Sequence, residues 1–198
     1  MESVLLHNGI DPASVMFTTL DSDNWMPEAY FEEMEFYLSE NGWKMDKYMF
    51  APGQMFSINN TRVPLLNRVI DTLMGAVLFI WSNNLTKVQN AASNYSLSFN
   101  RLKKHDFFDT NSDAMCDDFH NSMKYIWKSQ GEIEIIPIFV LANMMSLETG
   151  QGYLADSVAR FWQAERHMRV FLDAAYNFNM LFKNPFRWRT LWTTLAYF

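Results

Sequence analysis

The stretch EIEIIPIFVLANMMSLETG, residues 132–150, decides the fold class of this chain. An unbroken apolar run fits both helix and strand, so the stretch can be a short strand before Pro137 or a helix that begins there. It is long for a single strand, and the sequence shows no obvious second strand to pair with it. We therefore expect a helix that begins at Pro137.

The segments before this stretch carry further signs of helices. Pro27 suits a first helical position and Gly42 a C-terminal cap, so a helix is expected between them. Pro64 opens a second helix, which runs to Asn83 and is apolar on most sides. An all-round apolar helix is typically buried, so we expect this one at the centre of the fold.

Three more helices are expected from apolar residues at spacings of three and four. Residues 85–102 read as a heptad seam, and residues 112–131 as a helix capped by Ser112 and ended by Gly131. Residues 154–184 give the longest helix. Glu165 and Asn179 interrupt its apolar seam, where polar residues can fix register or partner choice.

The sequence therefore predicts a mainly α protein with a single helical domain of about six helices over residues 27–184. Residues 1–26 are rich in turn formers and are expected to form an extended N-terminal arm. Residues 185–198 are expected to form a C-terminal docking tail of aromatic and basic side chains. Partial alternation near residues 43–58 is also compatible with one small hairpin.

The composition indicates a folded chain with apolar surface to spare. Of 198 residues, 49% are hydrophobic, 16% are aromatic and 19% are charged, which is enough for a real core and favours a partner. One cysteine excludes an intrachain disulfide. The longest apolar stretch is far short of a membrane span, so we expect a cytoplasmic or virion protein, neither secreted nor transmembrane.

Charge is distributed unequally along the chain. Residues 1–50 carry ten Asp or Glu against two Lys, whereas residues 158–198 carry six Lys or Arg against two acids. The acidic residues gather on the outer side of the predicted first helix, and the basic ones on the last helix and the tail. Unequal ends of this kind favour head-to-tail contacts between copies.

Two sets of residues are the candidate contacts. The acidic docking face is Glu28, Glu32, Glu33 and Glu35. The basic and aromatic set, which would meet either another subunit or nucleic acid, is Arg160, Arg166, Arg169, Arg187, Trp188, Arg189 and Trp192.

We therefore expect a non-enzymatic assembly subunit of a homo-oligomeric particle, ring or filament, such as a virus coat or connector protein. Its partners would be other copies of itself or other subunits of the particle. The alternative is a nucleic-acid-binding module that uses the basic set, and both functions could be present in one protein.

A cluster of acids and histidines could hold a metal ion. It comprises His105, Asp106, Asp109, Asp113, Asp117, Asp118 and His120. It lacks the pattern of an EF-hand, and acids in a first helical turn are ordinary partners of the helix dipole. We therefore expect no metal and no cofactor. A metal-dependent enzyme that uses this cluster is the third hypothesis, after the assembly subunit and the nucleic-acid-binding module. No nucleophile elbow or phosphate loop occurs, so no enzyme activity is expected.

Overall fold

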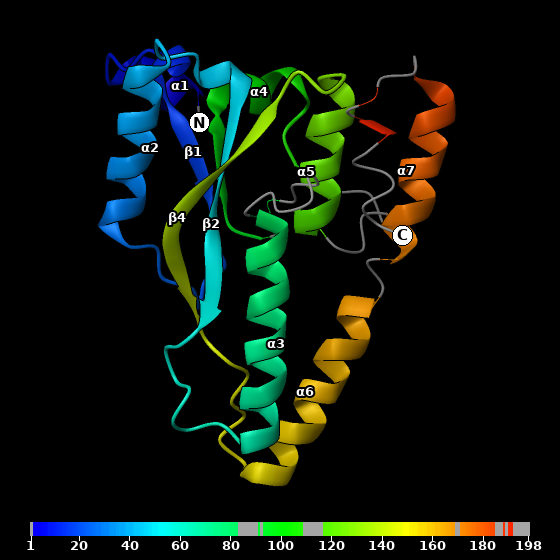
Figure 1. Cartoon of the computed structure of the whole chain (residues 1–198). Coiled ribbons are helices and arrows are strands. Elements are labelled where there is room, and N and C mark those ends of the chain that lie inside the picture. The colour runs from blue at the N-terminus through cyan, green and yellow to red at the C-terminus, as the bar shows by residue number, and fades with distance from the viewer. Residues whose placement is uncertain are drawn as a thin grey trace.

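The computed structural model describes residues 2–82, 91, 93–108, 117–168, 171–184, 188, 190 and 191. Its helices and strands are shown in Figure 1. The α-helices are α1 (Glu2–His7), α2 (Glu28–Glu40), α3 (Leu65–Ser82), α4 (Phe99–Lys104), α5 (Asp117–Lys128), α6 (Tyr153–Met168) and α7 (Phe171–Lys183), with 3₁₀ turns at Pro12–Ser14 and Met45–Lys47.

A mixed four-stranded sheet lies at the centre, so the prediction of a mainly α domain is wrong. The strands are β1 (Met16–Thr19), β2 (Tyr48–Phe56), β3 (Tyr95–Ser98) and β4 (Glu134–Met144), in the order β1-β3-β2-β4. Antiparallel pairing joins β1 to β3 and β3 to β2, whereas β2 and β4 are parallel. The fold is mixed α/β, and β1 comes from the segment expected to be an arm.

Strand β4 replaces the helix that was expected after Pro137. Its partner is β2, with Tyr48 opposite Glu134 and Phe56 opposite Met144. Pro137 has no N–H to donate, but β4 is an edge strand, where proline is tolerated. β2 is one continuous strand and not a hairpin, because Pro52 and Gly53 lie at a register shift within it instead of turning the chain.

Strand β3 overturns the helical interpretation of residues 95–98. Tyr95 and Leu97 are buried on one face of the sheet, and Ser96 and Ser98 are buried on the other. The Ser96 hydroxyl hydrogen bonds to Thr18 at 2.7 Å and to the Tyr30 hydroxyl at 2.9 Å. Residues 85–90 and 92 of the predicted seam lie outside the described residues.

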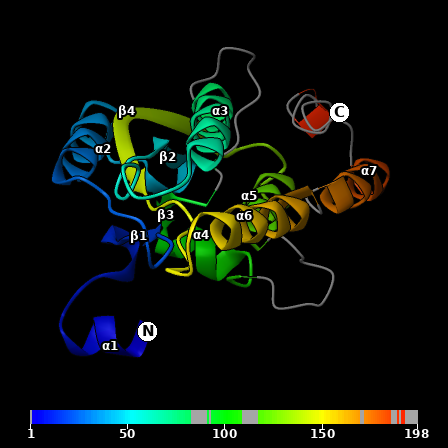
Figure 2. The same cartoon turned by 90° about the horizontal axis from the view of Figure 1, so that it is seen from below.

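The two faces of the sheet carry separate cores. On one face α2 packs through Tyr30, Met34 and Leu38 against Phe50 and other strand residues. On the opposite face α5 contributes Met123, Ile126 and Trp127 to a core that includes Met49, Leu97 and Ile135, with α7 packed beside it. Figure 2 shows α2 on one side of the strands and α3, α5, α6 and α7 on the other.

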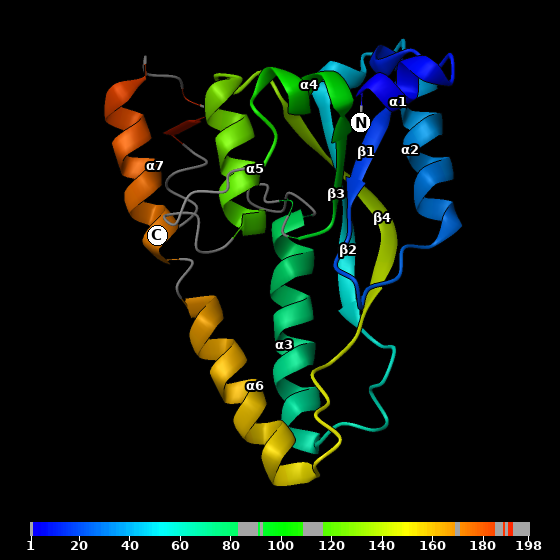
Figure 3. The same cartoon turned by 180° about the vertical axis from the view of Figure 1, so that it is seen from behind.

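Helices α3 and α6 extend beyond the end of the sheet as a pair, which we call the limb (Figures 1 and 3). The prediction that α3 is buried at the centre is wrong, since Leu65 and Leu73 are 67% and 64% exposed. Residues 154–184, expected as one helix, include α6 and α7 with residues 169 and 170 between them outside the described part. In the described chain, none of the helices is long and apolar enough to cross a membrane.

Candidate interaction surfaces

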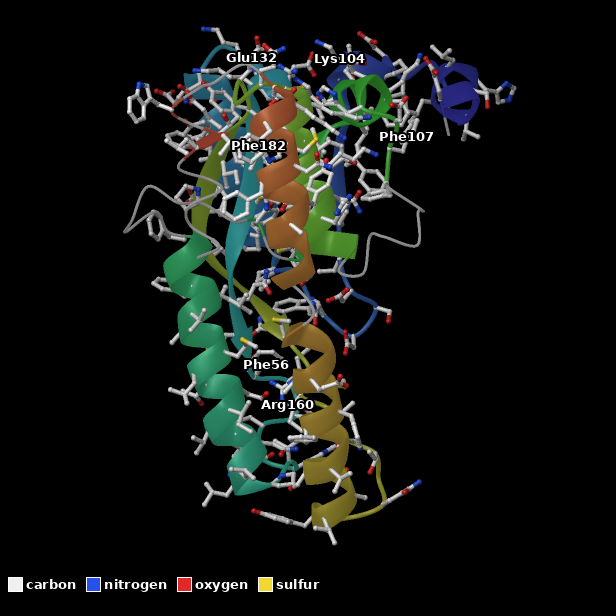
Figure 4. All side chains as sticks on the ribbon, turned by 90° about the vertical axis from the view of Figure 1, so that its right-hand side faces the viewer. Phe56, Lys104, Phe107, Glu132, Arg160 and Phe182 are labelled. Atoms are coloured by element: carbon white, nitrogen blue, oxygen red, sulfur yellow. The ribbon has the colours of Figure 1, made fainter. Side chains whose placement is uncertain are left out.

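The limb has a polar interior. Asp71 of α3 and Arg160 of α6 form an ion pair whose side chains are 3% and 2% exposed. The Ser146 hydroxyl donates to the second oxygen of Asp71, and Arg160 also donates to the side-chain oxygen of Gln163. The guanidinium lies 5.4 Å from the centre of the Phe56 ring, and Figure 4 shows Phe56 beside it. The facing sides of α3 and α6 are therefore joined by charge and hydrogen bonds.

A second set of buried polar groups fixes the loop that leads into α6. Asp156 accepts from the backbone N–H of Thr149 at 2.7 Å and from its hydroxyl at 2.5 Å, and these two bonds lower the pKa of Asp156. Asn59 exchanges two hydrogen bonds with the backbone of Ser146, at 2.8 and 2.9 Å. Asn67 of α3 donates to the Asp156 carbonyl. The start of α6 is thus held at a defined position along α3.

The outward sides of the same two helices are apolar. On α3, residues at a spacing of four form an exposed stripe, Leu65, Val69, Leu73 and Val77, that is 38–67% exposed. On α6, Leu154, Val158, Phe161 and Trp162 are 48–77% exposed. We call these two rows the limb stripes. The limb thus has a buried polar cluster between its two helices and two rows of large apolar residues on its outside, the reverse of an ordinary helix pair in water.

The molecule as a whole exposes more surface than a monomer of its size. Its accessible surface is 11278 Å², whereas a folded monomer of 23.3 kDa is expected to expose about 9,700 Å². The excess of about 1,600 Å² is about twice the roughly 800 Å² that each partner buries in a standard protein–protein interface. The limb stripes contribute eight large apolar residues to this exposed surface.

A groove of about 710 Å³ runs beside β4 on the other side of the molecule. It is lined by seven consecutive residues of β4, Glu134–Val140, and by Glu33, Phe36, Tyr37 and Glu40 of α2. Alternate residues of a strand point to opposite faces. A hollow that touches seven in a row therefore follows the edge of the strand and not one face of it.

The groove is acidic with an apolar rim. Glu33, Glu40 and Glu134 line it, and Glu134 pairs with Lys47 at 3.4 Å. Burial, followed by the neighbouring Tyr48 and Glu134, raises the pKa of the Tyr37 phenol, so Tyr37 adds no charge at pH 7. At the rim, Phe36 and Phe139 are 64% and 76% exposed.

The structure separates the four residues of the predicted acidic face. All four are exposed on α2. Glu33 lines the groove, whereas Glu28, Glu32 and Glu35 are not among the residues that line it. Glu40, which also lines the groove, was not in the predicted set, although it lies seven residues after Glu33 and therefore on the same side of the helix.

The predicted basic set is only partly described. Arg160 is buried in the limb and paired with Asp71, so its guanidinium is not on the surface where the sequence interpretation placed it. Trp188 is 68% exposed. The Arg166 side chain and residues Arg169, Arg187, Arg189 and Trp192 lie outside the described residues.

The acid and histidine cluster is also divided. Within the described ranges, no group of three or more His, Cys, Asp or Glu could hold a metal ion; Asp109 and Asp113 lie outside those ranges. His105 is buried against Tyr125, and burial followed by the charges of Arg101, Lys104 and Lys128 lowers its pKa to about 4. A neutral, enclosed imidazole of this kind is a packing residue at pH 7.

Comparison with the known protein families, with curated proteins and with solved structures gives no significant match to this chain.

Proposed function

We propose that this protein is a non-enzymatic structural subunit that assembles with copies of itself into a particle, ring or filament. The observation that carries the proposal is the pair of limb stripes, which expose large aliphatic and aromatic side chains on a limb whose interior is polar. Contiguous exposed apolar surface of this kind marks interaction sites in folded proteins.

The spacing on α6 supports a helical partner. Leu154, Val158 and Phe161 follow each other at four and three residues, as the apolar positions of a coiled-coil seam do, yet all three are exposed. A seam is stabilised only when a facing helix fills it. The excess surface of about 1,600 Å² on one copy is about twice the roughly 800 Å² that each partner buries in a standard interface, and the occupant we propose is a second copy.

Sedimentation velocity of the full chain over a range of concentrations and salt tests this function. Leu73→Glu on α3 and Phe161→Glu on α6 each place a charge on a limb stripe. A charge buried without a partner costs about 3 kcal/mol, so each variant should weaken self-association by about a hundredfold. Ser39→Glu, which adds the same charge to an exposed position of α2, is the control and should change nothing.

Two results would refute the proposal. One is a wild-type chain that sediments as a monomer at every concentration. The other is that Leu73→Glu and Phe161→Glu self-associate as strongly as the control variant Ser39→Glu.

A further inference from the structure

The groove beside β4 has the properties of a site that adds a strand to the sheet. β4 is the last strand in the order β1-β3-β2-β4, so one of its edges faces away from β2. In the described part of the chain, the one bridge recorded outside the four strands joins Trp25 to Asn143, beyond the seven groove residues. Along Ile135–Val140 no strand of the described chain pairs with that edge, so an extended peptide can add to it through its backbone, except at Pro137, which has no N–H to donate.

The charge of the groove selects the kind of peptide. Three carboxylates, Glu33, Glu40 and Glu134, line it, and Lys47 pairs with one of them. A second β4 strand from another copy would bring a second set of the same acids, and like charges placed together are unfavourable. The occupant must therefore carry basic residues, and Phe36 and Phe139 at the rim favour aromatic ones.

This chain contains a segment of that chemistry. Residues 192–198, WTTLAYF, are rich in aromatic and β-branched residues, which favour strands, and Arg187 and Arg189 precede them. The segment has seven residues, as many as the stretch of β4 that lines the groove. The described residues Trp188, Thr190 and Leu191 are helical, and the segment begins directly after them.

The groove and the origin of this segment lie on opposite sides of the molecule. Helix α7 ends at Lys183, and Figures 1 and 2 both place α7 across the sheet from α2. Residues 192–198 follow Leu191, eight residues after the end of α7, and the described residues just before them, drawn in red, lie beside α7 in Figure 1. The segment therefore starts on the side of the molecule away from the groove, from which it can reach the groove of a neighbouring copy. Contacts that join two different surfaces in this way are head-to-tail and generate rings or filaments.

We propose that the groove between α2 and β4 binds residues 192–198 of a second copy as an added β-strand, with Arg187 and Arg189 against the acids of the groove. This inference rests on the proposed assembly function and names a second contact for it. The contact is separate from the limb stripes, so the two can be tested independently.

The first test measures binding of a fluorescent synthetic peptide of residues 184–198 to the full chain by anisotropy. Glu33→Lys with Glu40→Lys should weaken binding by about tenfold, since two weak attractions become repulsions. Glu32→Lys with Glu35→Lys makes the same change in charge on α2 outside the groove, and it should have a much smaller effect. Equal effects of the two pairs would overturn the proposal.

The second test separates strand addition from attraction of charges. Two versions of the peptide carry N-methyl groups on alternate residues of 192–198, one on odd and one on even positions. Only alternate N–H groups of an added strand point to its partner, so one version should lose binding and the other should keep it. If both bind, or neither binds, the backbone pairing is refuted.

Sedimentation of the variant chains then separates this inference from the proposed function. The groove contact is supported if the double variant Glu33→Lys with Glu40→Lys assembles more weakly than the wild type and the control Glu32→Lys with Glu35→Lys does not. If the wild type assembles and both pairs assemble equally well, the groove contact is wrong and the assembly function stands. A wild type that stays monomeric refutes the assembly and with it the second copy as occupant.

Discussion

Breaking the ion pair between Asp71 and Arg160 should be among the most damaging single changes to this protein. Both side chains are almost fully buried. Asp71→Asn keeps the shape of the side chain and removes its charge, which leaves the Arg160 guanidinium buried with its neutral contacts to Gln163 and the Phe56 ring. An uncompensated buried charge costs about 3–5 kcal/mol, a large share of a total stability of about 5–15 kcal/mol.

The matched variants form a double-mutant cycle. Asp71→Leu and Arg160→Met should each be destabilising by about 3 kcal/mol or more, because each leaves one charge alone. The double variant should recover most of this loss, since apolar residues of similar size often replace a buried ion pair at little cost. With single losses of about 3 kcal/mol each and a loss of about 1 kcal/mol in the double variant, the coupling free energy between the two positions should be about 5 kcal/mol.

Urea unfolding followed by circular dichroism, with linear extrapolation to water, measures these values. Thr72→Ala, an exposed position next to Asp71 on α3, is the control for a change in the helix itself. The reasoning is refuted if Asp71→Asn lies within about 0.5 kcal/mol of the wild type, as a surface substitution would. It is equally refuted if the double variant loses the sum of the two single losses.

Two further predictions concern the cores. The pKa of His105 is about 4, below the unfolded value of about 6.5, because of burial and then Arg101. The unfolded state therefore binds more protons between these values, and the free energy of unfolding decreases as the pH is lowered. Urea unfolding should show a loss of about 2 kcal/mol from pH 7 to pH 5 that His105→Leu lacks, and an equal loss in both would contradict this. Tyr30→Phe removes a buried hydroxyl that donates to the Phe50 carbonyl at 3.1 Å, and it should lower the free energy of unfolding by about 1–2 kcal/mol. The control Tyr153→Phe, at an exposed position, should lower it by less than about 0.5 kcal/mol. Equal losses in the two variants would refute the role of the Tyr30 hydroxyl.

Local signals predicted the helices well where a helix depends on its own residues. The helix expected between Pro27 and Gly42 is α2, Glu28–Glu40, and the helix expected after Pro64 is α3, Leu65–Ser82. Proline fixes a helical backbone angle at the start of a helix, and Gly42 has the positive φ of 68° that ends one. These signals act within one turn and need no information from elsewhere in the chain.

The candidate surfaces could be predicted only in part. The sequence indicated surplus apolar surface and an acidic α2, and Glu33 does line the groove. It could not indicate that Arg160 is buried, because the partner that permits this burial, Asp71, is 89 residues earlier. The apolar residues of α3 were predicted to be core for a similar reason. Periodicity shows that a helix face is apolar, but it does not show which part of the protein covers that face.

The sequence by itself determined where most of the helices form, how charge is distributed along the chain and that apolar surface would be left over. The tertiary structure alone decided the sheet, because β4 becomes a strand by pairing with β2 across about 86 positions of sequence, and β3 by insertion between β1 and β2. It also decided which sides of α3 and α6 meet. Helix formation is local, whereas strand pairing and the matching of buried charges depend on residues that are distant in sequence and adjacent only in the folded protein.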